Sequence, residues 1–159
     1  MPILKHGNLI LLVALLVTAV VYAGGLNGPF LFDDHIHITQ NRWVKIDTLG
    51  WTDLAQAWHS SFSAFPSNRP LAQLSFGVNH ALSGLDPWAF KTTNLVIHLL
   101  SGLLVFVFIR LVLRALAGGA PLTQRDTLVA AAVAAVWLLH PMRSAEHTSE
   151  LQSRQGNSY

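Results

Sequence analysis

Three long apolar runs divide the chain, and one segment of mixed polarity separates the first two. The runs cover residues 9–26, 95–116 and 127–139. The first carries no charged side chain and has about the minimum length of a transmembrane helix. The third run alone is short for a spanning helix, but a helix that begins at Thr123 and ends at His140 would be long enough to cross. The pattern predicts membrane-spanning helices at about residues 9–26, 93–116 and 123–140.

The first run also fits a cleavable signal peptide. Lys5 gives it a basic start, an apolar core follows from Leu9 to Val21, and Val21-Tyr22-Ala23 resembles a cleavage site. From this segment alone, a retained anchor and a signal peptide stay equally open.

The mixed segment, residues 27–91, is too polar to span a membrane but is rich in Trp and Phe. Two helical apolar faces occur in it, and their members are Trp51, Leu54, Ala55, Trp58 and Phe62 for the first and Leu71, Leu74, Val78 and Leu82 for the second. Pro70 suits the start of the second helix and Gly84 its end. Short helices with Trp on the apolar side are typical of the membrane interface. Two helices packed on each other in a small soluble domain are the alternative, and the flanking membrane runs favour the interface.

Composition strengthens the membrane prediction. Of 159 residues, 52% are hydrophobic and only 11% are charged, against about 25% charged in a soluble domain. The low share of charged residues and the high share of hydrophobic ones argue against a soluble enzyme, a disordered tail and a nucleic-acid-binding protein. The net charge is only +2, so no extended basic patch is indicated. The chain has no Cys, which excludes a disulfide framework and thiol chemistry.

Lysine and arginine give a weak prediction of orientation. If the three helices alternate in direction, one side of the membrane receives Lys5, Arg110, Arg114 and Arg125. The other side receives Arg42, Lys45 and Lys91. The small excess on the first side favours a cytoplasmic N-terminus and an external loop at residues 27–91.

The C-terminal tail, residues 143–159, differs from the rest of the chain. Both Glu residues, Glu146 and Glu150, lie in this tail, and it shows neither a helical nor a strand period. Residues 146–153 spell EHTSELQS, which resembles a translated sequencing adapter. We therefore expect residues 143–159 to be disordered read-through rather than functional protein. An ordinary solvated C-terminus is the alternative.

Two adjacent carboxylates are the first candidate for chemistry. Asp33 and Asp34 directly follow the apolar residues 30–32. Neighbouring carboxylates beside apolar side chains resist being ionised together, and a carboxylate held in this way suits a general base. The alternative is a helix cap or a solvated turn. His35 and His37 add ligand types that divalent metals use, but no further ligand group accompanies them, so we predict no metal site.

Three further side chains are candidates for binding an anion. Pro70 pushes Arg69 toward an extended conformation, from which a guanidinium can bind phosphate through two hydrogen bonds. An ordinary helix start is the alternative. Lys91 lies just before the second membrane run, and His98 lies inside that run. An ionisable group there usually faces the protein interior or a water-filled cavity. For His98 the alternative is a neutral ring hydrogen-bonded to a neighbouring helix.

An ordered set of short motifs covers most of residues 1–142. The motifs are FLFDDHIHITQN at 30–41, NRPLAQLSFGVNHALSGLDPWAFKTTNLVIHLL at 68–100 and WLLHP at 137–141. In this order they resemble the N-terminus of the polytopic GT-C class of glycosyltransferases. The similarity is greatest to membrane proteins that carry tetratricopeptide repeats and are related to protein O-mannosyltransferases.

The resemblance implies a fold and a setting. We expect an all-α membrane protein with about three spanning helices, a retained first helix and short interfacial helices in an external loop at 27–91. In a bacterial inner membrane this loop is periplasmic. Members of the family continue after Pro141 with more helices and repeats. Residues 1–142 are therefore expected to be the N-terminal part of a larger membrane domain that is inactive alone.

The resemblance also implies an activity. A sugar would move from a polyprenyl-phosphate donor to a hydroxyl acceptor, for example on a protein, with membrane lipid as the other partner and no nucleic acid. Asp33 or Asp34 would act as the base, while Arg69, Lys91 and His98 would bind the donor phosphate. No particular cofactor is indicated. One alternative is a non-catalytic membrane protein whose external loop binds a partner, in which Asp33 and Arg69 lie apart. Another is a secreted domain released by signal cleavage.

Overall fold

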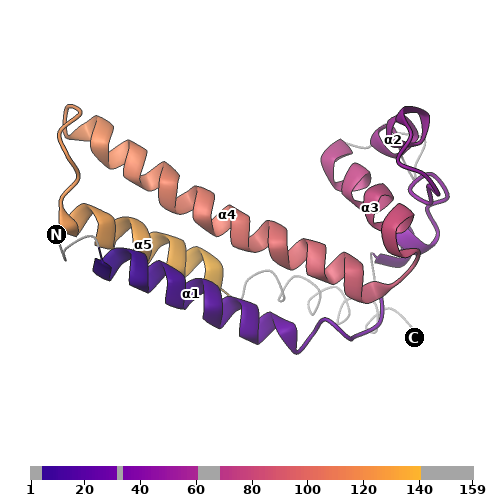
Figure 1. Cartoon of the computed structure of the whole chain (residues 1–159), viewed down its shortest axis with the longest axis horizontal. Helices are drawn as coiled ribbons and strands as arrows, with labels where there is room; N and C mark the ends of the chain where they lie inside the picture. The colour runs from indigo at the N-terminus through magenta and orange to yellow at the C-terminus, as the bar shows by residue number, and fades with distance from the viewer. Residues whose placement is uncertain (1–4, 32–33, 61–68, 141–159) are drawn as a thin grey trace, which may run out of the picture. The chain divides into compact units, whose positions relative to one another are not determined.

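The computed structural model describes residues 5–31, 34–60 and 69–140, and every regular element within these ranges is a helix (Figure 1). The elements in chain order are α1 (Lys5–Ala23), the π-helix η1 (His35–Thr39), α2 (Trp51–Trp58), α3 (Pro70–Ser83), α4 (Pro87–Leu116) and α5 (Gln124–Leu139). The predicted all-α fold is confirmed. The chain divides into two compact units, which we call the loop unit (Tyr22–Ile97) and the bundle unit (described residues 5–21 and 98–140).

Two helices in the described ranges are long and apolar enough to cross a membrane, α1 over His6–Ala23 and α4 over Pro87–Leu116. Large apolar side chains cover their exposed surfaces, as at Val20 (73% exposed) and Leu104 (68% exposed). A helix that is apolar on all sides needs lipid or other helices around it. The helix α5 has 16 residues, just below the roughly 17–25 that span a bilayer, so its crossing stays a prediction.

The helix α4 begins at Pro87, well before the predicted start near Thr93. The side chain of Asp86 accepts a hydrogen bond from the backbone N–H of Trp88 at 3.0 Å. Proline is favoured in the first turn because its missing N–H has no partner there in any case. At the other end, Gly118 and Gly119 adopt left-handed φ values of 65° and 84°, and these end the helix as the glycines predict.

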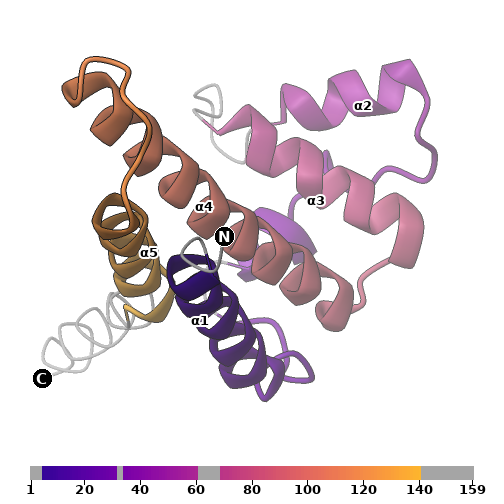
Figure 2. The same cartoon turned by 60° about the vertical axis from the view of Figure 1, so that its left-hand side comes forward.

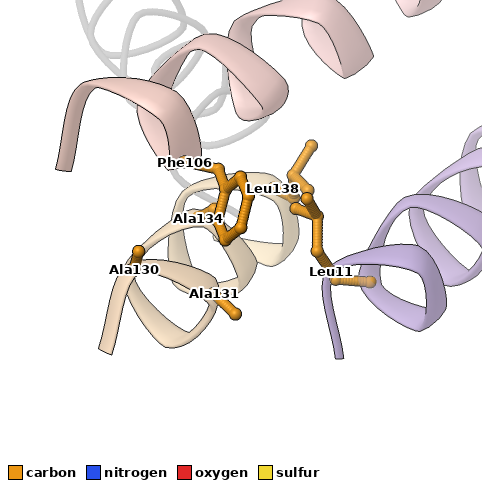
Figure 3. Packing of buried hydrophobic residues seen from close by; sticks show 7 residues of the cluster. Leu11, Phe106, Ala130, Ala131, Ala134 and Leu138 are labelled. Atoms are coloured by element: carbon orange, nitrogen blue, oxygen red, sulfur yellow. The ribbon is translucent and has the colours of Figure 1, made fainter. Parts of the chain in front are cut away.

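The core of the bundle unit joins three helices (Figure 3). Its members are Leu11 and Ala14 of α1, Phe106 of α4, and Ala130, Ala131, Ala134 and Leu138 of α5. Small residues on α5 let its neighbours approach closely. The contact between α1 and α5 is close as well, because a Cβ added at Gly7 would lie 2.7 Å from the Thr127 side chain. The side of α1 that carries Leu11 and Ala14 therefore packs inside this unit.

A capping box fixes the start of α5. The Thr123 hydroxyl accepts from the backbone N–H of Asp126 at 3.3 Å, and the Asp126 carboxylate accepts from the backbone N–H of Thr123 at 2.8 Å. Together these bonds satisfy donors that a bare helix end leaves unpaired. The observed start agrees with the predicted one at Thr123.

In the loop unit, α2 and α3 lie side by side (Figure 2). Their contact is close, because a Cβ at Gly77 would lie 2.7 Å from the Cβ of Ala57. The residues that α3 buries are Gln73, Gly77 and Asn79, rather than its predicted apolar face.

The apolar faces predicted for α2 and α3 stay largely open in this chain. Trp51 is 85% exposed, and Leu71 and Leu82 are 72% and 71% exposed. These three side chains are open, although α2 and α3 pack on each other. The choice between the membrane interface and a small soluble domain therefore stays a prediction. Phe62, the last member of the first predicted face, lies outside the described residues.

Candidate functional site

The predicted site residues fall into three groups. Asp33 lies outside the described residues. Asp34, Arg69 and Lys91 belong to the loop unit, whereas His98 belongs to the bundle unit. Each residue is therefore considered within its own unit.

Asp34 forms two hydrogen bonds with Leu31. Its carboxylate Oδ2 accepts from the backbone N–H of Leu31 at 3.0 Å, and its own N–H donates to the Leu31 carbonyl at 2.9 Å. The side chain is partly buried. This reciprocal pair of hydrogen bonds holds Asp34 against Leu31, so the Asp34 carboxylate is engaged by the backbone.

A single π-helical turn, η1, follows Asp34. The carbonyl of His35 accepts from the backbone N–H of Gln40 at 2.8 Å and from the Thr39 hydroxyl at 3.0 Å. Ile38 is buried, whereas His35 and His37 are exposed. Short π-turns are rare and frequently occur at functional sites. No group of three or more His, Cys, Asp or Glu side chains within the described ranges could hold a metal ion.

We call residues 30–41, which contain Asp33 and Asp34, the acidic segment. A buried amide pair ties Asn41, at the end of this segment, to α3. The Asn41 side-chain nitrogen donates to the Gln73 side-chain oxygen at 3.4 Å, and both residues are at most 5% exposed. Asn41 also accepts from the backbone N–H of Trp43 at 3.1 Å. Gln73 lies one turn after Arg69, whose carbonyl accepts from the Gln73 N–H at 3.1 Å. The acidic segment and the first turn of α3 are thus joined, although they lie far apart in the sequence.

Arg69 occupies the N-cap position of α3, immediately before Pro70. Its backbone φ is −131° and its ψ is 56°, so it lies outside the helical region as the following proline requires. The side chain is exposed. The Arg69 backbone is therefore fixed at the start of α3, one turn before the buried Gln73.

The start of α4 holds the other end of the acidic segment through aromatic rings. The Phe90 ring is buried and meets the Phe30 ring edge-on at 5.5 Å between centroids. It also contacts the Phe76 ring of α3 at 6.2 Å. Phe30 lies shortly before Asp33 and Asp34 in the sequence. Phe90 of α4, packed against Phe76 of α3, therefore holds the chain that leads into these two residues.

Lys91 holds the turn that follows α1. Its ammonium donates to the carbonyl of Gly28 at 2.9 Å and to that of Gly25 at 3.2 Å. A Cβ at Gly28 would lie 2.8 Å from the Lys91 nitrogen, so glycine is the residue that admits this contact. Sequence reasoning missed Gly28 and Gln73, because each acts through a partner far away in the chain.

Two further hydrogen bonds fix α3. The Thr93 hydroxyl donates to the side-chain oxygen of buried Asn79 at 2.8 Å. On the other side, the His80 ring nitrogen Nδ1 lies 2.9 Å from the Ile46 carbonyl and donates to it. Hydrogen bonds between polar side chains and the backbone thus hold α3 to the start of α4 and to the segment before α2 in the loop unit. The acidic segment is attached through Asn41.

His98 is buried in the bundle unit. Its Nε2 lies 3.1 Å from the Leu138 carbonyl, and because a carbonyl can only accept, the ring nitrogen donates. Leu138 is in the last turn of α5, where carbonyls have no partner inside the helix. His98 therefore caps the C-terminal end of α5, and its ring is hydrogen-bonded to a neighbouring helix.

Comparison with known proteins gives similarity over part of the chain. The human protein O-mannosyl-transferase TMTC4 is 33% identical over 102 residues, which is 58% of this chain and 13% of that protein. The Drosophila melanogaster protein O-mannosyl-transferase Tmtc1 is 31% identical over 102 residues, 59% of this chain and 11% of its own. The human protein O-mannosyl-transferase TMTC2 is 32% identical over 83 residues, 49% of this chain and 10% of its own.

The predicted resemblance to protein O-mannosyltransferases is thereby confirmed. The chain spans only about a tenth of the length of these relatives. No protein-family model matches the chain, and no solved structure matches it.

Proposed function

We propose that the chain forms the N-terminal part of a membrane domain that transfers a sugar from a polyprenyl-phosphate donor to a hydroxyl group, with a protein side chain as the acceptor. The observation that carries the proposal is the Asn41–Gln73 hydrogen bond, which ties the acidic segment to the helix start that bears Arg69. A transferase of this kind needs a carboxylate and a cation near each other at the reacting centre. The similarity to protein O-mannosyl-transferases supports the same assignment.

In the proposed reaction, Asp33 takes the proton of the acceptor hydroxyl as its oxygen attacks the anomeric carbon of the sugar. The bond from that carbon to the phosphate oxygen breaks, and the electron pair leaves with the polyprenyl phosphate. Arg69 stabilises the charge that develops on the leaving phosphate. Asp34 orients the base next to it in the sequence, as the bond of its own carboxylate to Leu31 supports.

Lys91 and His98 take smaller parts in this proposal. An ammonium group has three N–H donors, and Lys91 uses two of them on the carbonyls of Gly25 and Gly28. One donor remains for the donor phosphate. His98 acts indirectly, by holding α4 against the end of α5, because its Nε2 donates to the Leu138 carbonyl.

The proposed setting is the bacterial inner membrane with the loop unit in the periplasm. The exposed apolar faces at Trp51 and Leu71 then rest in the membrane interface. The same exposed faces also favour the second candidate, a non-catalytic membrane protein whose external loop binds a partner. The two candidates differ in whether the acidic pair is needed for sugar transfer.

The test uses the full-length protein in membranes, with Asp33→Asn and Asp34→Asn made singly. Removal of a general base lowers the rate by about 100-fold to 10,000-fold, so we expect that loss at one of the two positions. Asp47→Asn is the matched control, because Asp47 is an exposed carboxylate in the same unit. Its rate should equal that of the parent. If both site variants transfer sugar as fast as the parent, the base assignment is wrong.

A further inference from the structure

Charge in the bundle unit gathers at one end. In its described residues the cations are Lys5, Arg110, Arg114 and Arg125, and the only carboxylate is Asp126. Figure 1 shows the start of α1, the start of α5 and the end of α4 at the same end of this unit. The Gln124 side chain lies 3.4 Å from the His6 ring, which fixes α1 and α5 together there. An apolar bundle thus carries an excess of positive charge at one end.

The single carboxylate among these described residues is already engaged. Asp126 Oδ2 accepts from the backbone N–H of Thr123 at 2.8 Å and from its hydroxyl at 2.7 Å. These bonds belong to the capping box of α5. Asp126 therefore serves the helix start. Its hydrogen bonds with Thr123 lower its pKa, and among the arginines Arg125 beside it also favours its charged form and lowers that pKa.

Two of the cations stand one turn apart on the same helix face. Arg110 and Arg114 have the i, i+4 spacing, at which like charges repel. The Arg110 guanidinium lies over the Phe106 ring at 5.3 Å from its centroid. Its Nε is buried and has no hydrogen-bond partner within the described ranges. A phosphate between the two side chains would remove the repulsion and use this donor.

The surroundings indicate what carries that phosphate. Arg110 lies close to Leu116, the last residue of α4, at a separation of about 9 Å along the helix. On the same helix face, three residues before Arg110, Val107 is apolar and 49% exposed. A ligand that meets both the cations and this side chain has an anionic head and an apolar body.

We propose that Arg110 and Arg114, aided by Arg125, bind the headgroup of an anionic phospholipid in the leaflet that faces this end of the bundle unit. The lipid phosphate accepts from the two α4 guanidinium groups, and its acyl chains pack against the exposed apolar side chains beside them. The binding needs no sugar transfer and is independent of the proposed function.

The test measures lipid selectivity by electron paramagnetic resonance. The full chain is reconstituted in phosphatidylcholine bilayers that contain either spin-labelled phosphatidylglycerol or spin-labelled phosphatidylcholine. The parent should associate preferentially with phosphatidylglycerol. Each arginine near the surface contributes about fivefold to such a preference, so Arg110→Gln with Arg114→Gln should reduce it steeply. Added salt should also reduce it, because surface charge is screened.

The control pair Arg42→Gln with Lys45→Gln removes the same charge from the loop unit and should keep the parent preference. Circular dichroism of every variant checks that the helices form.

If the Arg110 and Arg114 variant loses helix, Arg125→Gln provides the test, because its exposed side chain lies outside the core. This variant should lower the preference by about fivefold. Equal association of the parent with both lipids would overturn the proposal, as would an unchanged preference in the folded arginine variants. A loss of equal size in the control pair would do the same.

Discussion

At the scale of single residues, the contacts of Lys91 explain why a lysine and a glycine occur far apart in the chain. The ammonium binds the carbonyls of Gly25 and Gly28, and a Cβ at position 28 would require it to move. The bound turn follows the end of α1, where a cation is also favoured by the helix dipole. Lys91 therefore positions the chain that leads to the acidic pair.

This contact predicts energetic coupling between Gly28 and Lys91. Gly28→Ala places a Cβ within 2.8 Å of the ammonium and should displace it, at a cost of about 1 kcal/mol for the lost hydrogen bonds. Lys91→Met removes the same bonds and should cost a similar amount. In the double variant the alanine should add less than about 0.5 kcal/mol, because neighbouring sites are not additive. Unfolding in detergent titrations measures all three variants, and fully additive losses would contradict the contact.

Sequence reasoning reached some of these residues and not others. Asp33, Asp34 and Arg69 stand out because carboxylates and a pre-proline arginine have recognisable chemistry in any fold. Gln73 does not, because a polar residue between apolar helix positions looks like solvent-facing surface. Its burial depends on Asn41, which lies far earlier in the chain, and no local pattern contains that pairing.

At the scale of elements, the contact between α4 and α5 rests on one face of α4. His98 caps the end of α5, and Gly102, one turn later, lies against Leu138. A Cβ at Gly102 would lie 2.5 to 2.9 Å from three atoms of the Leu138 side chain. The face therefore depends on one hydrogen bond and on the absence of a side chain.

The sign of one substitution tests this packing. Gly→Ala inside a helix normally stabilises by about 0.5–1 kcal/mol, because the backbone loses less freedom on folding. In Gly102→Ala the added Cβ would clash with Leu138. The free energy of unfolding should therefore fall by about 1–3 kcal/mol instead of rising. A detergent unfolding titration measures the change. Stabilisation of the helix bundle by Gly102→Ala would show that α4 and α5 do not meet there.

Helix positions were predictable where apolar runs end at strong breakers. The glycines after α4 mark its end, Pro70 is the first residue of α3, and Thr123 is the N-cap of α5. The start of α4 was missed because the polar residues 91–94 look like a boundary. Asp86 and Pro87 were the available signal, since an aspartate before a proline suits a helix start. The buried face of α3 was missed because it is polar and small, and its partners come from other segments.

At the scale of the whole molecule, the two units have different surfaces and different chemistry. The bundle unit is apolar, with its charges at one end, and its exposed side chains need lipid or further helices. The loop unit carries most of the aspartates that precede residue 143, together with Arg69 and Lys91. Candidate chemistry and membrane anchoring are thus separated along the chain, as the apolar runs predicted.

The polyprenyl-phosphate donor distinguishes this proposed transferase from one that uses a nucleotide sugar, so the most direct measurement follows the sugar. Membranes that contain the full-length protein receive a radiolabelled polyprenyl-phosphate sugar and a hydroxyl acceptor, with an Arg69→Gln variant in parallel. We predict that the parent moves label to the acceptor and releases polyprenyl phosphate. With the variant, loss of one charge-stabilising group should slow transfer by about 100-fold or more. Label that stays on the lipid with the parent, or that reaches the acceptor only from a nucleotide sugar, would contradict the account.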